Sequence, residues 1–392
     1  MATFPVTLEP RAEDVPSESA AADVLAFLDD GDLDRLRRRA SDATADDVER
    51  SLRARGRGLD ELAVLLSPAT ADRLDDLAAA AHEVTVRRFG RVVRLFAPLY
   101  LSNVCASTCT YCGFSAGNEI ARRTLSVDEV RTEAAALRER GFRHLLLVSG
   151  EHARIVSKDY LAQCVRAVAD EVPSVSVEVQ VWDTPTYRRL VDAGCEGLVV
   201  YQETYDRATY AATHVRGKKR NYDWRLAAPD RGAAAGMRQL GVGALLGLHD
   251  DWRVDALAVA AHAQALIRRW WRCQVSISLP RLRPAAGGFQ PARPVDDREF
   301  VQLICALRLV LPDVGLSLST REAQPMRDGL TRLGVTQMSA GSHTEPGGYA
   351  AESEAEPQFE ISDTRSPAEV AAALRGAGYD PVWMDTIGPR RR

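Results

Sequence analysis

The sequence predicts an α/β protein: a (β/α)8 barrel of the TIM type, with a helical N-terminal extension and a short C-terminal tail. Two observations support this fold class. Over residues 91–345, short apolar runs rich in β-branched residues alternate with amphipathic helical runs, as in barrels of parallel strands. Polar residues also stand at the ends of nearly every expected strand, which is typical of a barrel mouth. A doubly wound open sheet is the alternative that this polar pattern disfavours.

The N-terminal extension is expected over residues 1–90. Residues 1–20 contain three prolines together with Glu and Ser, and we expect a flexible lead there. From residue 22 to 84 apolar residues recur at three- and four-residue spacing, which predicts about four helices. Ser67-Pro68 is expected to begin a helix, because proline is tolerated at the first helical position.

The barrel region is expected to hold eight strands, each followed by a helical or looped connection. The strands are expected at residues 94–102, 144–149, 175–181, 197–202, 242–248, 274–279, 315–319 and 335–340. The main helices are expected at residues 126–139, 158–172, 186–193, 224–240, 253–270 and 296–311.

The C-terminal tail, residues 346–392, is expected to pack on the barrel. Residues 366–377 predict a helix with a serine cap, proline at the first position and a glycine stop. Another short segment is expected at residues 381–384.

Composition excludes several classes of protein. The chain has 392 residues, a formal net charge of −4 and 27% charged residues, without the basic face that nucleic-acid binding needs. No apolar run approaches the length of a membrane span. The N-terminus lacks the pattern of a secretory signal, so we expect a cytoplasmic location. There the seven cysteines should be thiols or ligands rather than disulfides.

Three cysteines carry the clearest chemical signal. Cys105, Cys109 and Cys112 follow the first expected strand with C-x3-C-x2-C spacing. Three thiolates can bind three irons of a [4Fe–4S] cluster, which leaves the fourth iron open to another ligand. The alternatives are a zinc site, which would need a fourth ligand, or simple buried thiols. The remaining cysteines are interpreted as small hydrophobic residues: Cys164, Cys195, Cys273 and Cys305.

The motif C-x3-C-x-Tyr-Cys, followed by Gly113-Phe114, resembles the radical S-adenosyl-L-methionine (SAM) superfamily. This resemblance implies a [4Fe–4S] cluster whose open iron is chelated by the amino and carboxylate groups of SAM. It also implies that electron transfer to SAM generates a 5′-deoxyadenosyl radical. Tyr111, the aromatic residue of the motif, is expected to contact the cofactor.

From about residue 45 onward the chain is most similar to the 2-iminoacetate synthase family, the tyrosine lyases of thiazole biosynthesis. The segments that carry the resemblance are 98–103, 149–152, 178–180, 201–205, 228–231, 280–284, 319–322, 337–350 and 381–383. The resemblance implies cleavage of the Cα–Cβ bond of L-tyrosine to 2-iminoacetate (dehydroglycine) and p-cresol. SAM would become 5′-deoxyadenosine and methionine, and the product would supply the thiazole moiety of thiamine. Thiazole synthase and a flavodoxin- or ferredoxin-type electron donor are the implied partners.

The same resemblance assigns residues to SAM. Ser149, Gly150 and Glu151 end the second expected strand, where the superfamily supports the amino group of SAM. Gln202 and Glu203 end the fourth, where a ribose hydroxyl would find an acceptor.

Arg225 and Arg231 follow on the next helical segment. Either could pair with the SAM carboxylate in a charge-assisted bond. Surface ion pairs with Asp223 or Asp230 are the competing interpretation.

Arg321 and Ser339 are the expected substrate residues, since the seventh and eighth strands end beside them. By resemblance to the aromatic amino-acid lyases, Arg321 should bind the substrate carboxylate and Ser339 should support it; a guanidinium suits a carboxylate. A salt bridge of Arg321 with Glu322 is the structural alternative, and Arg281 is the rival anchor. Tyr100 is expected near cluster and substrate, or else in the core.

Two other functions remain open, and a third is disfavoured. A tryptophan-lyase type of enzyme would share this architecture. A non-catalytic iron–sulfur scaffold would share the cysteines. The hydrogenase-maturation tyrosine lyase carries a second cluster on C-terminal cysteines, and no cysteine follows Cys305 here.

Overall fold

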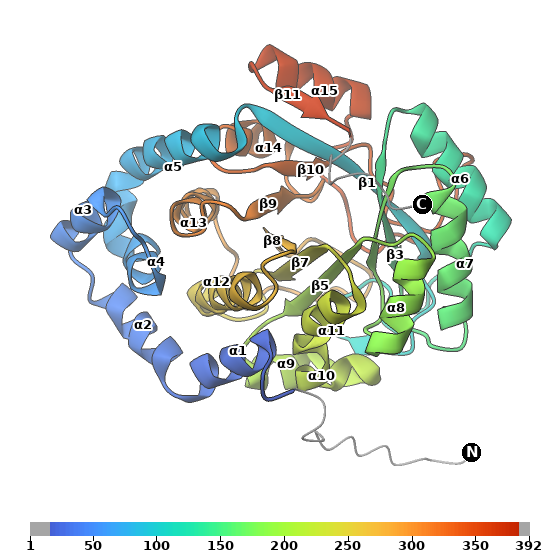
Figure 1. The fold of residues 1–392 in the computed structure, drawn as a ribbon, viewed down its shortest axis with the longest axis horizontal. Coiled ribbons are helices and arrows are strands. Elements are labelled where there is room, and N and C mark those ends of the chain that lie inside the picture. The colour runs from blue at the N-terminus through green and yellow to red at the C-terminus, as the bar shows by residue number, and fades with distance from the viewer. Residues whose placement is uncertain (1–15, 384–392) are drawn as a thin grey trace.

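The computed structural model describes residues 16–383. Its centre is a closed barrel of eight parallel strands (Figure 1), so the fold class expected from the sequence is confirmed. In order around the barrel the strands are β1 (Val92–Ser102), β3 (His144–Ser149), β4 (Ser174–Glu178), β5 (Gly197–Glu203), β7 (Gln239–Ala244), β8 (Gln274–Ser278), β9 (Gly315–Leu318) and β10 (Gln337–Ser339). Parallel pairing of β10 with β1, including Phe96 opposite Ser339, closes the ring.

Alternate residues of each strand face the barrel interior and the surrounding helices. In β3, Leu145 and Leu147 join the main core under the helices, whereas Leu146 and Val148 line the interior. The helices between strands are α6 (Val127–Glu139), α7 (Lys158–Ala169), α8 (Thr184–Asp192), α12 (Trp252–Arg269), α13 (Asp297–Val310) and α14 (Gln324–Thr331). Capping boxes begin α6 and α13, which explains why their starts were predictable.

The N-terminal helices form a belt around one side of the barrel, seen in blue in Figure 1. They are α1 (Ala20–Asp29), α2 (Asp32–Ser41), α3 (Ala45–Arg53), α4 (Leu59–Leu65), the 3-10 helix η1 (Pro68–Arg73) and α5 (Leu74–Phe89). Proline 68 therefore does begin a helix, of the 3-10 type. Because α1, α2 and α4 pack on α12, and α5 packs on α13, these two barrel helices are buried on nearly all sides.

The region after β5 differs from the sequence expectation. The single helix expected over 224–240 is wrong: α10 (Tyr222–Leu226) and α11 (Ala228–Ala235) replace it, and β7 already begins at Gln239. Gly236, with a φ of 103°, ends α11 in the left-handed conformation. The strand expected over 242–248 is therefore displaced toward the N-terminus.

Short elements before α10 also escaped prediction. They are α9 (Arg207–Thr213), β6 (His214–Arg216) and the 3-10 helix η2 (Lys218–Arg220). Strand β6 pairs antiparallel with β2 (Thr108–Cys109), a two-residue strand within the cysteine loop. This small ladder ties the cysteine loop to the segment that follows β5.

The tail contains the expected helix, α15 (Pro367–Gly376), begun by a capping box between Ser366 and Glu369. It is followed by β11 (Asp380–Val382), which pairs with the first residues of β1; the end of the expected segment, Met384, lies outside the described residues. The division at residues 90 and 345 stays a prediction. No helix within residues 16–383 is long and apolar enough to cross a membrane.

Candidate active site

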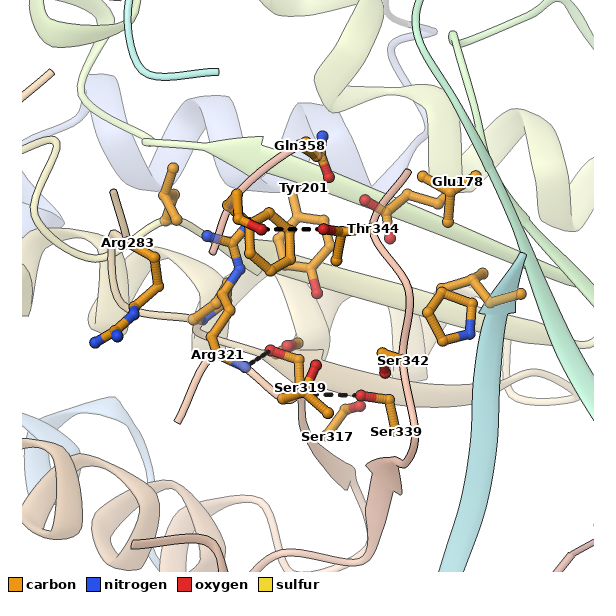
Figure 2. Close-up of a pocket in the computed structure, with 18 of the residues that line it drawn as sticks. Glu178, Tyr201, Arg283, Ser317, Ser319, Arg321, Ser339, Ser342, Thr344 and Gln358 are labelled. Carbon is orange, nitrogen blue, oxygen red and sulfur yellow. Dashed lines mark hydrogen bonds between the residues drawn. The ribbon is translucent and has the colours of Figure 1, made fainter. Parts of the chain in front are cut away.

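A cavity lies at the carboxyl ends of the barrel strands (Figure 2). Residues from β1, β3, β4, β5, β8, β9 and β10 and from the loops after them face it. The polar residues that line it are Tyr100, Tyr111, Cys112, Glu178, Tyr201, Glu203, Ser278, Arg283, Ser317, Ser319, Thr320, Arg321, Ser339, Ser342, Thr344 and Gln358. A mouth at this end of a (β/α)8 barrel is where catalytic residues of such enzymes gather.

The three cysteines of the motif lie in the loop after β1, at one side of this cavity. Cys109 is buried, whereas Cys105 and Cys112 are partly exposed. No three His, Cys, Asp or Glu side chains among residues 16–383 are grouped to hold one metal ion. In a cubane the three thiolates would bind three different irons. Burial raises the pKa of Cys105 to about 11, and coordination to a cluster iron would lower it, with release of the proton to solvent.

The loop after β3 lies directly against the cysteine loop. The backbone N–H of Gly150 donates to Ser102 O at 2.8 Å, and that of Ala106 donates to Glu151 O at 2.8 Å. A Cβ on residue 150 would lie 2.4 Å from Val104 O, so only glycine allows this approach. The hydroxyl of Ser149 is buried without a hydrogen-bond partner among the described residues. This cradle, with one unpaired polar atom, fits a bound SAM beside the cysteines.

Charged residues predicted for SAM form a paired cluster on the same side. Nη1 of Arg225 lies 2.9 Å from Glu151 Oε1, and its Nη2 lies 3.8 Å from Glu203 Oε1. Nζ of Lys219 lies 2.7 Å from the same Glu203 oxygen. The structure thus brings Glu151, Glu203 and Arg225 together and adds Lys219.

Glu203 has an unusual backbone conformation. Its φ of 73° is the only positive value at a non-glycine residue among those described, and the β5–β7 register shifts beside it. Burial opposes the charge of Glu203, but Lys219 and then Arg225 outweigh burial and lower its pKa. Burial likewise opposes the charge of Lys219, but the carboxylate of Glu203 raises its pKa. A strained residue in a buried charge cluster indicates a functional position.

The other residues predicted for SAM are placed differently. The Tyr111 hydroxyl lies 2.9 Å from His214 Nε2, and the ring faces the cavity. Gln202 faces away from the cavity and donates to Tyr222 O at 3.3 Å. The Arg231 guanidinium donates to Trp182 O at 2.9 Å and stacks on the Trp224 ring.

Arg231 is therefore not brought into the charge cluster. Its contacts are those of a structural arginine, because a backbone carbonyl and an indole face already engage its guanidinium. Its assignment to the SAM carboxylate stays a prediction that the geometry does not support, as does the ribose assignment of Gln202.

Arg321 lies on the opposite side of the cavity, after β9. Its guanidinium carbon lies 3.3 Å from the centroid of the Phe359 ring, and burial lowers its pKa. Within residues 16–383 its guanidinium has no ion-pair partner. The Oγ of Ser339 lies nearby and accepts a hydrogen bond of 3.2 Å from the Thr320 N–H.

The ion pairs of Glu322 bear on both alternatives for Arg321, namely a salt bridge with Glu322 and Arg281 as the anchor. This carboxylate is only 3% exposed in its side chain and pairs with Arg281, not with Arg321. Arg281 also pairs with Asp297 at 2.8 Å. The rival anchor is therefore already neutralised, and the salt bridge suggested for Arg321 is not formed. Figure 2 shows the guanidinium of Arg283, a further lining residue, directed away from Ser339.

Tyr100 of β1 and Gln358 of the C-terminal tail contact each other in a further part of the cavity lining. The Tyr100 hydroxyl donates to Gln358 Oε1 at 2.8 Å. Nε2 of the same Gln358 lies 3.8 Å from Cys112 Sγ, and the N–H of Gly113 donates to Gln358 O at 3.2 Å. Gln358 therefore connects the barrel interior to a cysteine of the motif, and hydrogen bonds to a cluster sulfur tune its potential.

Sequence reasoning missed Glu178, Lys219 and Gln358. Glu178 could have been found, since polar and apolar residues alternate along Ser174–Glu178 and the last polar one ends the strand. Lys219 gave no such signal, because its partner Glu203 is reached only through the unpredicted β6. Gln358 comes from a tail with no regular element at that point.

Comparisons with known proteins agree with this geometry. Residues 99–260 match the model of the Radical SAM superfamily, and residues 278–380 match the Biotin and Thiamin Synthesis associated domain. The FeFe-hydrogenase maturase HydG from Carboxydothermus hydrogenoformans superposes with a TM-score of 0.85 at 33% identity, over 93% of this chain and 85% of that one. Methylornithine synthase PylB, with a TM-score of 0.71 at 21% identity, covers 86% of this chain and 97% of that one, and shows the fold alone.

Curated relatives are similar over nearly the whole chain. The 2-iminoacetate synthase of Escherichia coli (strain K12) is 47% identical over 354 residues, which cover 90% of this chain and 94% of the relative. That of Salmonella typhimurium is 46% identical, with 90% and 93% covered. At this identity and coverage, the chain belongs to the 2-iminoacetate synthase family, radical SAM lyases that use a [4Fe–4S] cluster and S-adenosyl-L-methionine.

Proposed function

We propose that this lyase cleaves the Cα–Cβ bond of L-tyrosine to 2-iminoacetate and p-cresol and supplies the thiazole moiety of thiamine. The observation that carries the proposal is Arg321, a partly buried guanidinium that faces the cavity and has no ion-pair partner among residues 16–383. A charge that is partly withdrawn from water without a partner is costly, so the site suits an anion. The carboxylate of an amino acid provides one with matching bidentate geometry.

The opposite wall suits an aromatic ring. Phe96, Leu146 and Val148 line the cavity there, and Tyr100 packs edge-on against Phe114 with ring centroids 5.8 Å apart. A substrate whose carboxylate lies on Arg321 can thus place an aromatic side chain against an apolar surface. Burial of the ring in such a pocket would contribute a few kcal/mol to binding.

The residues divide into two roles in this proposal. Cys105, Cys109 and Cys112 hold the cluster, and the residues around Gly150 and Glu203 hold SAM. When bound, these cofactors supply a 5′-deoxyadenosyl radical, with 5′-deoxyadenosine and methionine as final products. Arg321 and Ser339 fix the substrate, Tyr100 supports it, and the walls of the barrel exclude water.

We further propose the partners and location that the family resemblance implies. 2-Iminoacetate is unstable in water, which favours direct transfer to thiazole synthase. A flavodoxin- or ferredoxin-type protein is the proposed electron donor. The proposed location is the cytoplasm, and we propose that residues 91–345 form the catalytic barrel between a helical extension and the tail.

Product analysis after anaerobic reconstitution tests the proposal. Protein with SAM, dithionite and L-tyrosine should form p-cresol and 5′-deoxyadenosine, together with glyoxylate from hydrolysis of 2-iminoacetate. A parallel reaction with L-tryptophan should give no indole-derived product. Turnover of tryptophan but not tyrosine would replace the proposed substrate, and a protein that binds iron but never cleaves SAM would be a scaffold.

A further inference from the structure

Glu178 and Arg321 occupy opposite walls of the barrel. Glu178 is the last residue of β4, and Arg321 follows β9. In the barrel order, β3, β1 and β10 separate these strands on one side, and β5, β7 and β8 separate them on the other. Both side chains line the same cavity, and Figure 2 shows them on opposite sides of it, with Tyr201 between them in this view. The mouth therefore has a cation on one wall and a carboxyl group on the other.

Glu178 differs from the other acids of the site because no partner for it lies within the described part of the chain. Glu151 and Glu203 are both engaged by Arg225 or Lys219. Within residues 16–383, the carboxyl group of Glu178 forms neither a hydrogen bond nor an ion pair. Burial raises its pKa to about 7, and the carboxylate of Glu203 acts in the same direction.

The surroundings of Glu178 indicate what it could receive. In the register of the sheet it stands beside Val148, whose neighbour in β1 is Tyr100. Val148 belongs to the apolar wall, which also includes Phe96 and Leu146. Glu178 is thus an unpaired hydrogen-bonding group, among residues 16–383, at the edge of a surface that suits an aromatic ring. A ring that carries a hydroxyl group could lie on this wall and donate to the carboxyl oxygen.

The geometry of an amino acid excludes its α-amino group as the donor to Glu178. Carboxylate and α-amino group are attached to the same carbon atom, so an amino acid held by Arg321 keeps its amino group on that side. Its side chain is the only part that can cross the mouth. In tyrosine, the phenol hydroxyl stands at the far end of a rigid ring and is a strong donor to a carboxylate.

We propose that Glu178 accepts a hydrogen bond from the phenol hydroxyl of the substrate and thereby selects tyrosine over phenylalanine. This inference rests on the proposed tyrosine-lyase function and names the residue that sets its specificity. Sites built to bind a hydroxyl group reject the analogue that lacks it, because their own polar group is then left unpaired. Glu178 is in this sense a binding residue, and no proton transfer needs to be assigned to it.

Binding measurements with matched variants test the inference. Anaerobically reconstituted full-length protein with SAM would be titrated with L-tyrosine and with L-phenylalanine by calorimetry. Wild type should prefer tyrosine by ~100-fold. Glu178→Leu should weaken tyrosine binding by ~30-fold and leave phenylalanine binding unchanged or tighter. Glu178→Gln, whose amide oxygen still accepts, should keep most of the tyrosine preference.

Controls separate this role from structural effects. Ser176→Ala removes a polar side chain two residues earlier on β4, on the same face of the strand but farther from the mouth. This variant should keep the tyrosine preference. SAM affinity of Glu178→Leu should equal that of wild type. Equal loss of tyrosine and phenylalanine binding, loss of SAM binding, or an unchanged preference in Glu178→Leu would each overturn the assignment.

The proposed function fails by a different outcome: wild type that releases no p-cresol from tyrosine. Wild type that cleaves tyrosine, together with a Glu178→Leu variant of unaltered preference, would remove only the inference on Glu178.

Discussion

The two sides of the active-site mouth treat their charges in opposite ways. On the side of β3 and β5, the carboxylates of Glu151 and Glu203 are matched by the cations of Arg225 and Lys219. On the side of β9, Arg321 lines the cavity without an ion-pair partner in the described part of the chain. We call these the paired side and the open side. Under the proposed function, the difference means that the cofactor region is organised in advance and the substrate region is completed by its ligand.

The largest effect is expected from loss of the cluster, because the proposed roles of both sides depend on it. Cys109→Ala should abolish the cluster and all SAM cleavage, because two remaining thiolates cannot hold the cubane in place. Iron analysis and the visible absorption of the reconstituted protein measure this. Cys305→Ala, a buried cysteine on α13, is the matched control and should keep full iron content. An iron-loaded, active Cys109→Ala protein would contradict the ligand assignment.

The open side is broken by Arg321→Ala. This change removes the only contact expected to neutralise the substrate carboxylate, so kcat/KM for tyrosine should fall by ~100-fold or more while iron content and SAM binding persist. Steady-state kinetics at saturating SAM gives the result.

Arg281→Ala provides the contrast. It should lower the free energy of unfolding by about 3 kcal/mol, because Glu322 is left buried without its partner, and should affect the KM for tyrosine much less. Denaturant unfolding measures the first effect. If Arg281→Ala, and not Arg321→Ala, raised the KM for tyrosine, the two arginines would exchange roles.

The paired side is weakened by Lys219→Met. Glu203 then keeps only its longer contact with Arg225, and we expect SAM affinity to fall by ~10-fold. Equilibrium dialysis with SAM measures this change. Lys218→Met, at an exposed neighbouring position, should bind SAM as wild type does; equal losses in both variants would point to overall charge instead of the Glu203 contact.

The smallest effect concerns Glu178 and pH. Burial raises its pKa to about 7 in the folded chain, against 4.5 for an ordinary glutamate. Its stability contribution is therefore present below pH 4.5 and is lost as the pH rises through 7. Glu178→Gln should remove this dependence and be more stable than wild type at pH 8, by about 1 kcal/mol after allowance for partial exposure. Thermal unfolding of wild type and Glu178→Gln at several pH values measures this. If the stability of both proteins changed with pH in the same way, the pKa of Glu178 would not be raised, and its carboxyl group would already be paired.

The sequence allowed the barrel to be predicted because local patterns specify it. β-Branched runs, capping boxes and the C-x3-C-x2-C spacing are all readable within a few residues. The helix expected over 224–240 was wrong because Pro229 stands in the first turn of a second helix, α11, and Gly236 ends that helix before β7 begins. The position of Arg321 after a strand could be predicted from the sequence. The lack of a salt bridge between Arg321 and Glu322 could not, because Glu322 pairs with Arg281, which follows a different strand.

The position of Gln358 in the sequence affects the order in which the site can form during synthesis. It stands 246 residues after Cys112, the cysteine that it contacts, and it also holds Tyr100. A ribosome that has made two thirds of the chain has therefore already released every cysteine of the motif, but neither Arg321 nor Gln358. The cysteine loop is therefore synthesised well before Gln358, so the contacts of Gln358 with Tyr100 and Cys112 can form only after most of the chain has been made.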